Sequence, residues 1–154
     1  MSKIQRKYMA HFIEAGEGVY VRLGSDLEEY APELSATVEK TKNILGATSV
    51  AVVGYEKSAA VTPYYARVGD PLFARLQAII DGDLALDEVK THVVEVKLWE
   101  ENEGGFPAIR EEVYLEVTSY GGDTTGYQIP FVIHYTGIKE HGRFNVDELA
   151  FTKA

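Results

Sequence analysis

Cysteine is absent from this chain of 154 residues. Disulfides, thiol nucleophiles and thiolate metal sites are therefore excluded together, and stability has to come from packing, to which oligomerisation can add. Long apolar runs are absent as well. No stretch approaches the roughly 18 consecutive apolar residues of a membrane-spanning helix, and Met1 to Lys7 lead into no apolar signal segment. We therefore expect a protein without a membrane anchor that is made in the cytosol.

The motifs of catalysis and of cofactor binding are missing too. No His-Glu-x-x-His spacing of a zinc site surrounds the four scattered histidines, His11, His92, His134 and His141. The sequence has neither a Gly-x-Ser-x-Gly nucleophile elbow nor a phosphate-binding Walker sequence. Neighbouring acids such as Glu28 and Glu29 would point to opposite faces of a strand, so they rarely converge on one substrate. We therefore predict no catalytic site, no metal and no cofactor.

Basic residues are fewer than acidic ones. The chain has 15 Lys and Arg against 24 Asp and Glu, for a formal net charge of −9. A surface of this charge repels phosphate, which argues against capture of nucleic acid through the whole surface. The composition, 45% hydrophobic and 25% charged, is that of a globular protein, and the length fits a single domain over residues 1–154. We expect one acidic, folded domain.

Most of the patterned segments predict β-strands. Alternating or β-branched residues indicate strands over 18–23, 47–55, 59–66, 92–100, 112–120 and 127–136. Pro63 weakens one of these strands, because proline cannot donate a hydrogen bond to a sheet. The predicted fold class is therefore mainly β.

Two of these strands form the clearest pair. Alternation after Val93 places Val94 and Val96 on the inner face of the first strand, with Glu95, Lys97 and Trp99 on its outer face. The partner strand has an apolar side, made of Val113, Leu115 and Val117, which we expect to face inward as well. Turn residues over 101–107 connect the two segments, so the sequence predicts an antiparallel hairpin.

One α-helix is predicted near residues 70–81. Asp70 suits the position before the helix and Pro71 suits its first turn, while Asp81 and Gly82 end it. Apolar residues recur with the spacing of one helical face, at Leu72, Phe73, Leu76, Ile79 and Ile80. This face could bind a partner, but a single amphipathic helix in a β-rich chain more often packs on the chain's own sheet.

Two segments stand outside this pattern. The connection over about 24–42 begins as an acidic stretch broken by Pro32, so we expect a long exposed loop. The carboxy-terminal segment, about 137–154, is polar at first and ends in Val146 to Phe151. It is expected to form either a last short strand or an arm laid on a neighbouring subunit.

The order of these elements resembles that of the phage major tail tube proteins. The resemblance rests on Lys42-Asn43-Ile44-Leu45-Gly46 before a strand, on Gly69-Asp70-Pro71-Leu72-Phe73 before the helix, and on Thr118 to Gly126 between two later strands. It covers nearly the whole chain, although each pattern is short. The inner tube proteins of contractile injection systems and type VI secretion are related to this family, and the sequence does not separate these groups.

The resemblance implies a fold and a structural role. The implied fold is a β-sandwich or half-barrel of antiparallel strands with one flanking α-helix. The resemblance implies that six copies close into a ring, and that rings stack head to tail into a tube through which DNA passes without specific binding. It also implies a tape measure protein as a partner, together with tail terminator and baseplate proteins at the tube ends. The chain would then belong to the tail of a virion and assemble in the cytoplasm of a bacterial host.

The site hypotheses follow from this implied assembly. We expect Glu95, Lys97 and Glu116 to face the lumen, where an excess of negative charge would keep DNA from adhering. The residues expected at contacts between subunits or rings are Asp26, Leu27, Glu28, Glu29, Tyr30, Trp99, Phe144 and Phe151.

Two alternatives from other classes remain open at this point. A small β-barrel binding module would show the same short strands and single helix, but it would remain monomeric and present a concave site. A carboxylate-based hydrolase would need two acids from different strands to converge, one of them with a raised pKa.

Overall fold

A computed structural model describes residues 1–100 and 105–154, and it shows a mainly β fold with one α-helix, as the sequence predicts. The elements, in chain order, are η1 (Arg6–Tyr8), β1 (Met9–Gly16), β2 (Val19–Arg22), β3 (Ala36–Lys42), β4 (Thr48–Tyr55), β5 (Ser58–Val61), α1 (Pro71–Gly82), η2 (Leu86–Val89), β6 (Lys90–Lys97), β7 (Phe106–Val117), β8 (Phe131–Asn145) and β9 (Ala150–Lys153). Of the expected 101–107 connection, residues 101–104 lie outside the described residues.

The body of the molecule is one curled antiparallel sheet, nearly closed into a half-barrel. Its strands lie in the order β2-β1-β6-β7-β8-β5, and β9 pairs with the far end of β8. The predicted hairpin is the β6–β7 pair, with Thr91 opposite Val113 and Val96 opposite Ala108. β1 was not expected as a strand, although it lies inside the sheet between β2 and β6.

The curled sheet buries residues on both of its faces. One core lies between the sheet and α1 and includes Val93, whereas a second core near β9 includes Val94 and Val96. Clean alternation on β6 predicted a single inner face, and this prediction is wrong because each side of the strand has a core of its own. The buried valines of β6 thus come from both faces of the strand, Val93 from one and Val94 and Val96 from the other.

Helix α1 forms for the local reasons that the sequence indicates. The Asp70 carboxylate accepts a hydrogen bond from the Leu72 backbone N–H at 3.0 Å and so caps the first turn. Leu72, Leu76 and Ile79 are buried against the sheet, and Phe73 and Ile80 pack beside them. The apolar face of α1 therefore belongs to the chain's own core.

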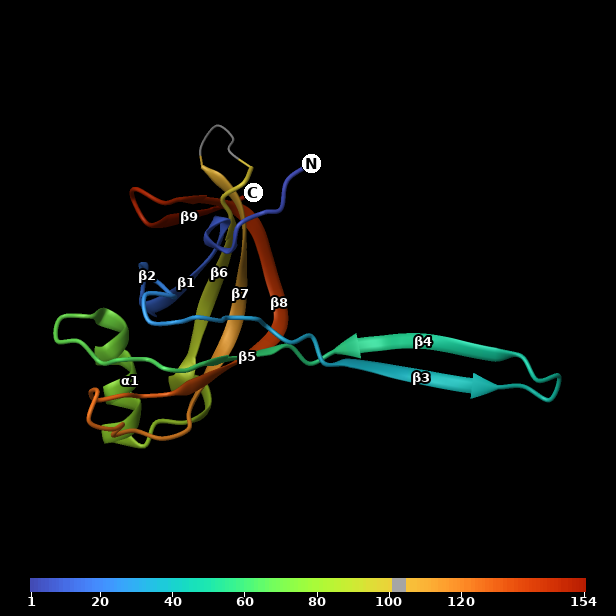
Figure 1. Cartoon of the computed structure of the whole chain (residues 1–154), viewed down its shortest axis with the longest axis horizontal. Coiled ribbons are helices and arrows are strands. Elements are labelled where there is room, and N and C mark those ends of the chain that lie inside the picture. Colours follow the sequence, from blue (N-terminus) through green and yellow to red (C-terminus); the bar gives the residue numbers. More distant parts are fainter. Residues whose placement is uncertain (101–104) are drawn as a thin grey trace.

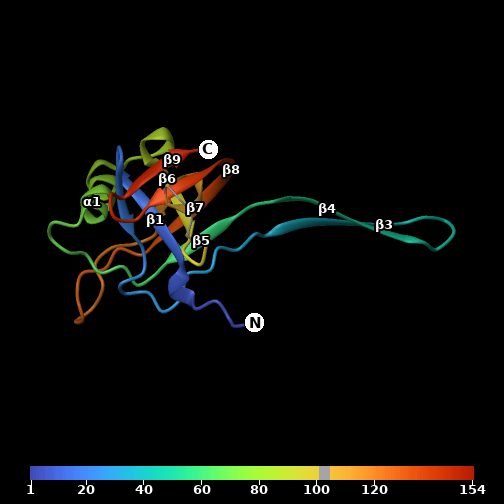
Figure 2. The same cartoon turned by 90° about the horizontal axis from the view of Figure 1, so that it is seen from above.

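A long two-stranded hairpin projects from this body, as Figures 1 and 2 show from two directions. We call residues 36–55, which comprise β3, β4 and their turn, the β3–β4 arm. The expected loop over 24–42 is therefore wrong in its last part, because 36–42 pair with β4 in a separate two-stranded sheet. The turn forms around Asn43, whose side-chain Oδ1 accepts the backbone N–H groups of Leu45 and Ala47 at 2.9 and 3.0 Å.

The carboxy-terminal segment folds back on the body. Residues as far as Asn145 continue β8 beside β7, and β9 then pairs with the end of β8. Of the two alternatives expected for 137–154, the short strand is correct. A free arm is not formed, because the backbone hydrogen bonds of this segment are made within its own sheet.

Candidate functional site

The β3–β4 arm has two different faces. Cross-strand pairing brings Val38 opposite Val52, and Lys40 opposite Val50, so these four side chains lie on one face. The paired residues of the opposite face are small or polar, namely Thr37, Glu39, Thr41, Ser49 and Ala51, and Val53 is the unpaired residue of a bulge. Val38, Val50 and Val52 remain 48%, 61% and 55% exposed. The arm thus presents an apolar stripe flanked by lysines, and the described residues leave this stripe largely uncovered.

The tip of the arm is more exposed still. Ile44 and Leu45 form the turn with fractional exposures of 101% and 87%. Two adjacent apolar side chains at the end of a projecting hairpin cannot contribute to the stability of their own body. Together with the valine stripe, they make the arm an apolar surface that is available to another molecule.

The root of the arm, by contrast, is fixed by buried polar contacts. The Lys57 ammonium, just after β4, donates to Glu111 Oε1 at 2.9 Å and lies 4.5 Å from the centre of the Tyr135 ring. Tyr30, which precedes β3, shares a hydrogen bond of 2.9 Å with the Tyr135 hydroxyl, and burial raises the pKa of both phenols. These contacts hold both ends of the arm against β7 and β8.

The sheet also has two open edges. Ser58 of β5 exchanges backbone hydrogen bonds with Glu33 on the side away from β8. Ala60 lies two residues further along, so its N–H and C=O point to the same side, beside a cavity of about 320 Å³ that Ala31 and Thr62 also line. At the other end of the sheet, β2 pairs with β1 on one side, and no strand of the described ranges pairs with its other side. Open edges of this kind are sites at which another strand can add.

A compact polar cluster lies where β1, β2, β6 and β7 meet. Glu14 accepts a hydrogen bond at 3.0 Å from His92 Nδ1, if this nitrogen carries the proton, and forms an ion pair at 3.3 Å with Arg110, which also donates to the Tyr20 hydroxyl at 3.1 Å. Burial raises the pKa of Glu14, but the hydrogen bonds of His92 and Gly18 and the charge of Arg110 together bring it below its ordinary value. Glu14 is therefore ionised at neutral pH and would make a poor proton donor.

The pKa values of three further carboxyl groups also lie below their ordinary values. Arg67 lowers the pKa of Asp26, His11 lowers that of Glu95, and hydrogen bonds from Thr125 lower that of Asp123. A hydrolase of the expected kind needs one carboxyl group with a raised pKa. In the described ranges, 1–100 and 105–154, no group of three or more His, Asp or Glu is arranged to hold a metal ion.

The residues expected to line a lumen lie on different faces of the sheet. Glu95 is opposite Ile109 and shares its face with Val93, and it lies 3.5 Å from His11. Glu116 belongs to the other face, where its carboxylate is 2.7 Å from His134. The expectation of one wall carrying both acids is therefore wrong. The expectation assumed that Val94 and Val113 point to the same side of the sheet. In the observed register Val113 is opposite Thr91, so it shares a face with Thr91 and not with Val94. Lys97, the third expected lumen residue, is half-buried on the Glu95 face.

The residues expected at contacts in the 26–30 segment divide into two groups. Asp26 forms a two-point ion pair with Arg67, at 2.6 and 2.9 Å, and Leu27 packs against the main core. Tyr30 is buried at the root of the arm. Glu28 and Glu29 alone in this set are exposed, so the segment is mainly held by its own body.

The other three aromatic residues expected at contacts, besides Tyr30, are Trp99, Phe144 and Phe151. Phe144 is fully buried in the second core, 4.5 Å from the Phe12 ring, and Phe151 packs beside it. Phe144 therefore cannot reach a neighbouring subunit in this fold. Trp99 follows the end of β6 and is 38% exposed, so it remains accessible but is not on a strand face.

The apolar stripe of the arm was not predicted from the sequence. Its signals were present, because β-branched residues at Thr37, Val38 and Thr41 precede the Asn43 turn and the strand after it. The expected loop over 24–42 included the first strand of this pair, so the pairing was missed.

Within the described part of the chain, no helix is long and apolar enough to cross a membrane. No protein-family model matches the chain, and comparison with curated proteins finds no match either.

Proposed function

We propose that this chain is a structural subunit that assembles into rings and a hollow tube of the phage tail type. The observation that carries the proposal is the β3–β4 arm, which projects from the body with its apolar stripe uncovered (Figure 1). A two-stranded hairpin is marginally stable on its own in water, so a long exposed arm is best explained by a partner that covers it. A subunit of an assembly provides that partner.

The partner is a second copy of the same chain. Each copy has an arm and two open sheet edges, β2 and β5, at opposite ends of its sheet. A contact between two different surfaces of identical subunits does not close on itself after one step. It makes a ring when the rotation closes, and a second contact along the axis makes a fibre. The arm and the two edges together provide surfaces for both contacts, the one within a ring and the one between stacked rings.

The tube would act as a conduit in the tail of a virion. The net charge of −9 supports passage of DNA without adhesion, because like charges repel along the wall. A tape measure protein would occupy the lumen during assembly in the bacterial cytoplasm, and terminator and baseplate proteins would cover the ends. An inner tube of a contractile injection or secretion system has the same architecture and is the alternative within this class.

Electron microscopy of concentrated purified protein, combined with sedimentation velocity, tests the proposal. We expect rings or hollow tubes above a critical concentration and a slowly sedimenting monomer below it. A chain that stays monomeric at millimolar concentration over a range of salt would overturn the proposal and favour a monomeric binding module.

A further inference from the structure

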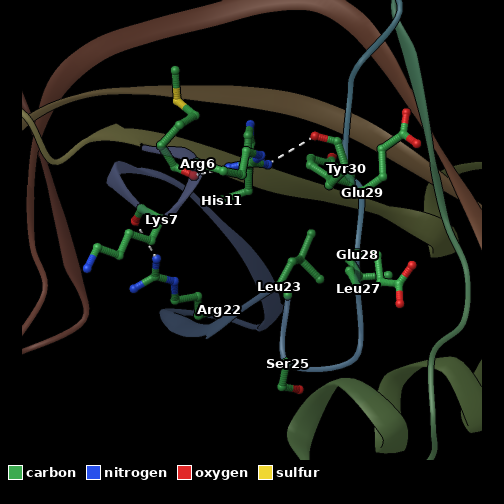
Figure 3. Close-up of a pocket in the computed structure, with 12 residues that line it drawn as sticks. Arg6, Lys7, His11, Arg22, Leu23, Ser25, Leu27, Glu28, Glu29 and Tyr30 are labelled. Atoms are coloured by element: carbon green, nitrogen blue, oxygen red, sulfur yellow. Dashed lines mark hydrogen bonds between the residues drawn. The ribbon is translucent and has the colours of Figure 1, made fainter. Parts of the chain in front are cut away.

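A hollow lies beside the amino-terminal end of β1. It has a volume of about 490 Å³, and its walls come from η1, the start of β1, the end of β2 and the 23–30 segment (Figure 3). Both polar and apolar groups line it: Arg6, Lys7 and Arg22 at the opening, and His11, Leu23 and Leu27. The arm contributes no residue to this hollow, and of the two edge strands β2 contributes Arg22.

The charge of the hollow is opposite to that of the protein. In the described residues, Arg6, Lys7 and Arg22 form no ion pair. Backbone carbonyls hold the two arginine side chains in place instead: Arg6 donates to Tyr30 O at 3.0 Å and Arg22 to Lys7 O at 2.9 Å. Glu28 and Glu29 also line the hollow, but Figure 3 shows their carboxylates directed away from Lys7 and Arg22. Three cations without acidic partners favour an anionic ligand.

One residue that lines the hollow belongs to the interior of the sheet. His11 of β1 is 4% exposed, and its Nε2 lies 3.5 Å from a carboxylate oxygen of Glu95 on the neighbouring strand β6. His11 therefore forms part of the inner wall, and the cations lie on η1 and at the end of β2.

We propose that this hollow binds the acidic turn at residues 81–88 of a second copy, an inference that rests on the proposed self-assembly. The turn carries four exposed carboxylates, those of Asp81, Asp83, Asp87 and Glu88. In the middle of them, Leu86 is 84% exposed. Carboxylates would meet the cations at the opening, and Leu86 would lie against Leu23 and Leu27.

The hollow and the acidic turn are two different surfaces of the chain, so a contact between them is heterologous. The turn directly follows the carboxy-terminal end of α1, whereas Figure 3 shows α1 below Ser25 at the border of the hollow. Each added copy leaves one hollow and one acidic turn free, which is the arrangement that continues around a ring or along a tube.

The first test is a titration of the full-length chain, below its assembly concentration, with a synthetic peptide of residues 81–88. We expect NMR shifts at His11, Leu23 and Arg22, and an affinity that falls at least about tenfold between 0.05 and 0.5 M NaCl, because exposed charges are screened. The matched control peptide has Asn and Gln in place of the four acids and should not bind. A peptide of residues 145–150, which contains Asp147 and Glu148, should bind more weakly, and stronger binding of this peptide than of the 81–88 peptide would overturn the choice of turn.

The second test uses charge reversal in the assembling protein. Lys7→Glu combined with Arg22→Glu should raise the critical concentration at least about tenfold, because like charges then face each other across the contact. Adding Asp83→Lys and Asp87→Lys to the same chain should restore assembly. The matched control is Lys153→Glu, an exposed lysine on β9, and it should leave the critical concentration unchanged.

The outcomes separate this inference from the proposed function. Assembly of the Lys7→Glu, Arg22→Glu variant at the wild-type concentration would overturn the inference and leave tube formation intact. If the wild-type chain never assembles, the proposed function fails, and the peptide titration decides by itself whether the hollow is a site for acidic segments.

Discussion

The arm and the body consist of the same kind of structure, antiparallel β-strands, but they differ in what stabilises them. In the body, Phe131 and Ile133 of β8 are at most 1% exposed. In the arm, every residue of β3 is exposed, and of the β4 residues only Gly54 is not. β-branched residues favour strands in both regions, but burial of apolar surface stabilises only the strands of the body. The arm is therefore a strand pair whose apolar face lacks a partner among the described residues.

The two regions also differ in charge. The arm has two lysines, Lys40 and Lys42, and a single acid, Glu39, whereas the chain as a whole has a net charge of −9. The acidic excess therefore belongs to the body. A basic, apolar arm and an acidic body are complementary, which gives contacts between copies a direction and selects against arm-to-arm pairing.

The largest predicted effect is that of removing the arm. Replacing Ala36–Tyr55 with two glycines is compatible with the body, because Glu56 N donates to Leu34 O at 3.0 Å and the two ends are already adjacent. We expect a body with the wild-type melting temperature that no longer forms rings or tubes at any concentration at which the wild type does. Thermal unfolding and electron microscopy measure the two results, and tube formation by the armless chain would contradict the role of the arm.

A matched pair of arm variants sharpens this experiment. Val38→Asp with Val52→Asp changes the apolar stripe, and Thr41→Asp with Ala51→Asp places the same charge on the opposite face. The first variant should raise the critical concentration much more than the second. Equal effects would mean that the arm acts through its charge or its length and not through its stripe.

The elements that the sequence predicted well are those with strong local signals. Asp70 and Pro71 define the start of α1. In the paired strands β6 and β7, apolar and polar residues alternate over Val94 to Lys97 and over Val113 to Val117. β1 was missed because its strand character depends on a position inside the sheet between two neighbours. The Asn43 turn was locally visible, but whether the two strands around it join the body or leave it is a tertiary property.

The candidate site was less accessible to sequence reasoning than the fold. Glu95 and Glu116 were assigned to one face because facing strands were aligned by their apolar residues, and a register shifted by one residue reverses that assignment. The basic hollow has no sequence signal at all, because Arg6 and Arg22 are brought together by the pairing of β1 with β2. Such sites appear only when segments distant in sequence meet.

The second prediction compares equivalent truncations in the two regions. Phe144→Ala removes a ring from the second core, where Phe144 is fully buried, and it should lower the free energy of unfolding by about 3–5 kcal/mol. Tyr55→Ala in the arm, where the side chain is 62% exposed, should change the stability of the isolated chain by less than about 0.5 kcal/mol. Urea denaturation below the assembly concentration measures both. A small effect at Phe144 would show that this residue is not part of the core.

The smallest predicted effect is the dependence of the body on pH. Hydrogen bonds of His92 and Gly18 and the charge of Arg110 outweigh burial and bring the pKa of Glu14 below its ordinary value of 4.5. A carboxyl group with a lowered folded-state pKa stabilises the fold above its unfolded-state pKa, and this contribution is lost as the pH falls through the folded-state pKa. Glu14→Gln should therefore cost about 1–2 kcal/mol at pH 7, and the difference from the wild type should shrink as the pH falls below 4.5.

The matched control for this prediction lies in the arm. Glu39 is exposed, and it forms no ion pair or side-chain hydrogen bond with the residues that the structure describes. Glu39→Gln should leave both the stability at pH 7 and its decline in acid unchanged. Denaturant unfolding of the wild type and the two variants between pH 3 and pH 7 measures these slopes. If Glu14 acts through its charge, the stability difference between Glu14→Gln and the wild type must disappear once the wild-type carboxylate is protonated. A difference that stays constant over this range would show that Glu14 acts through packing.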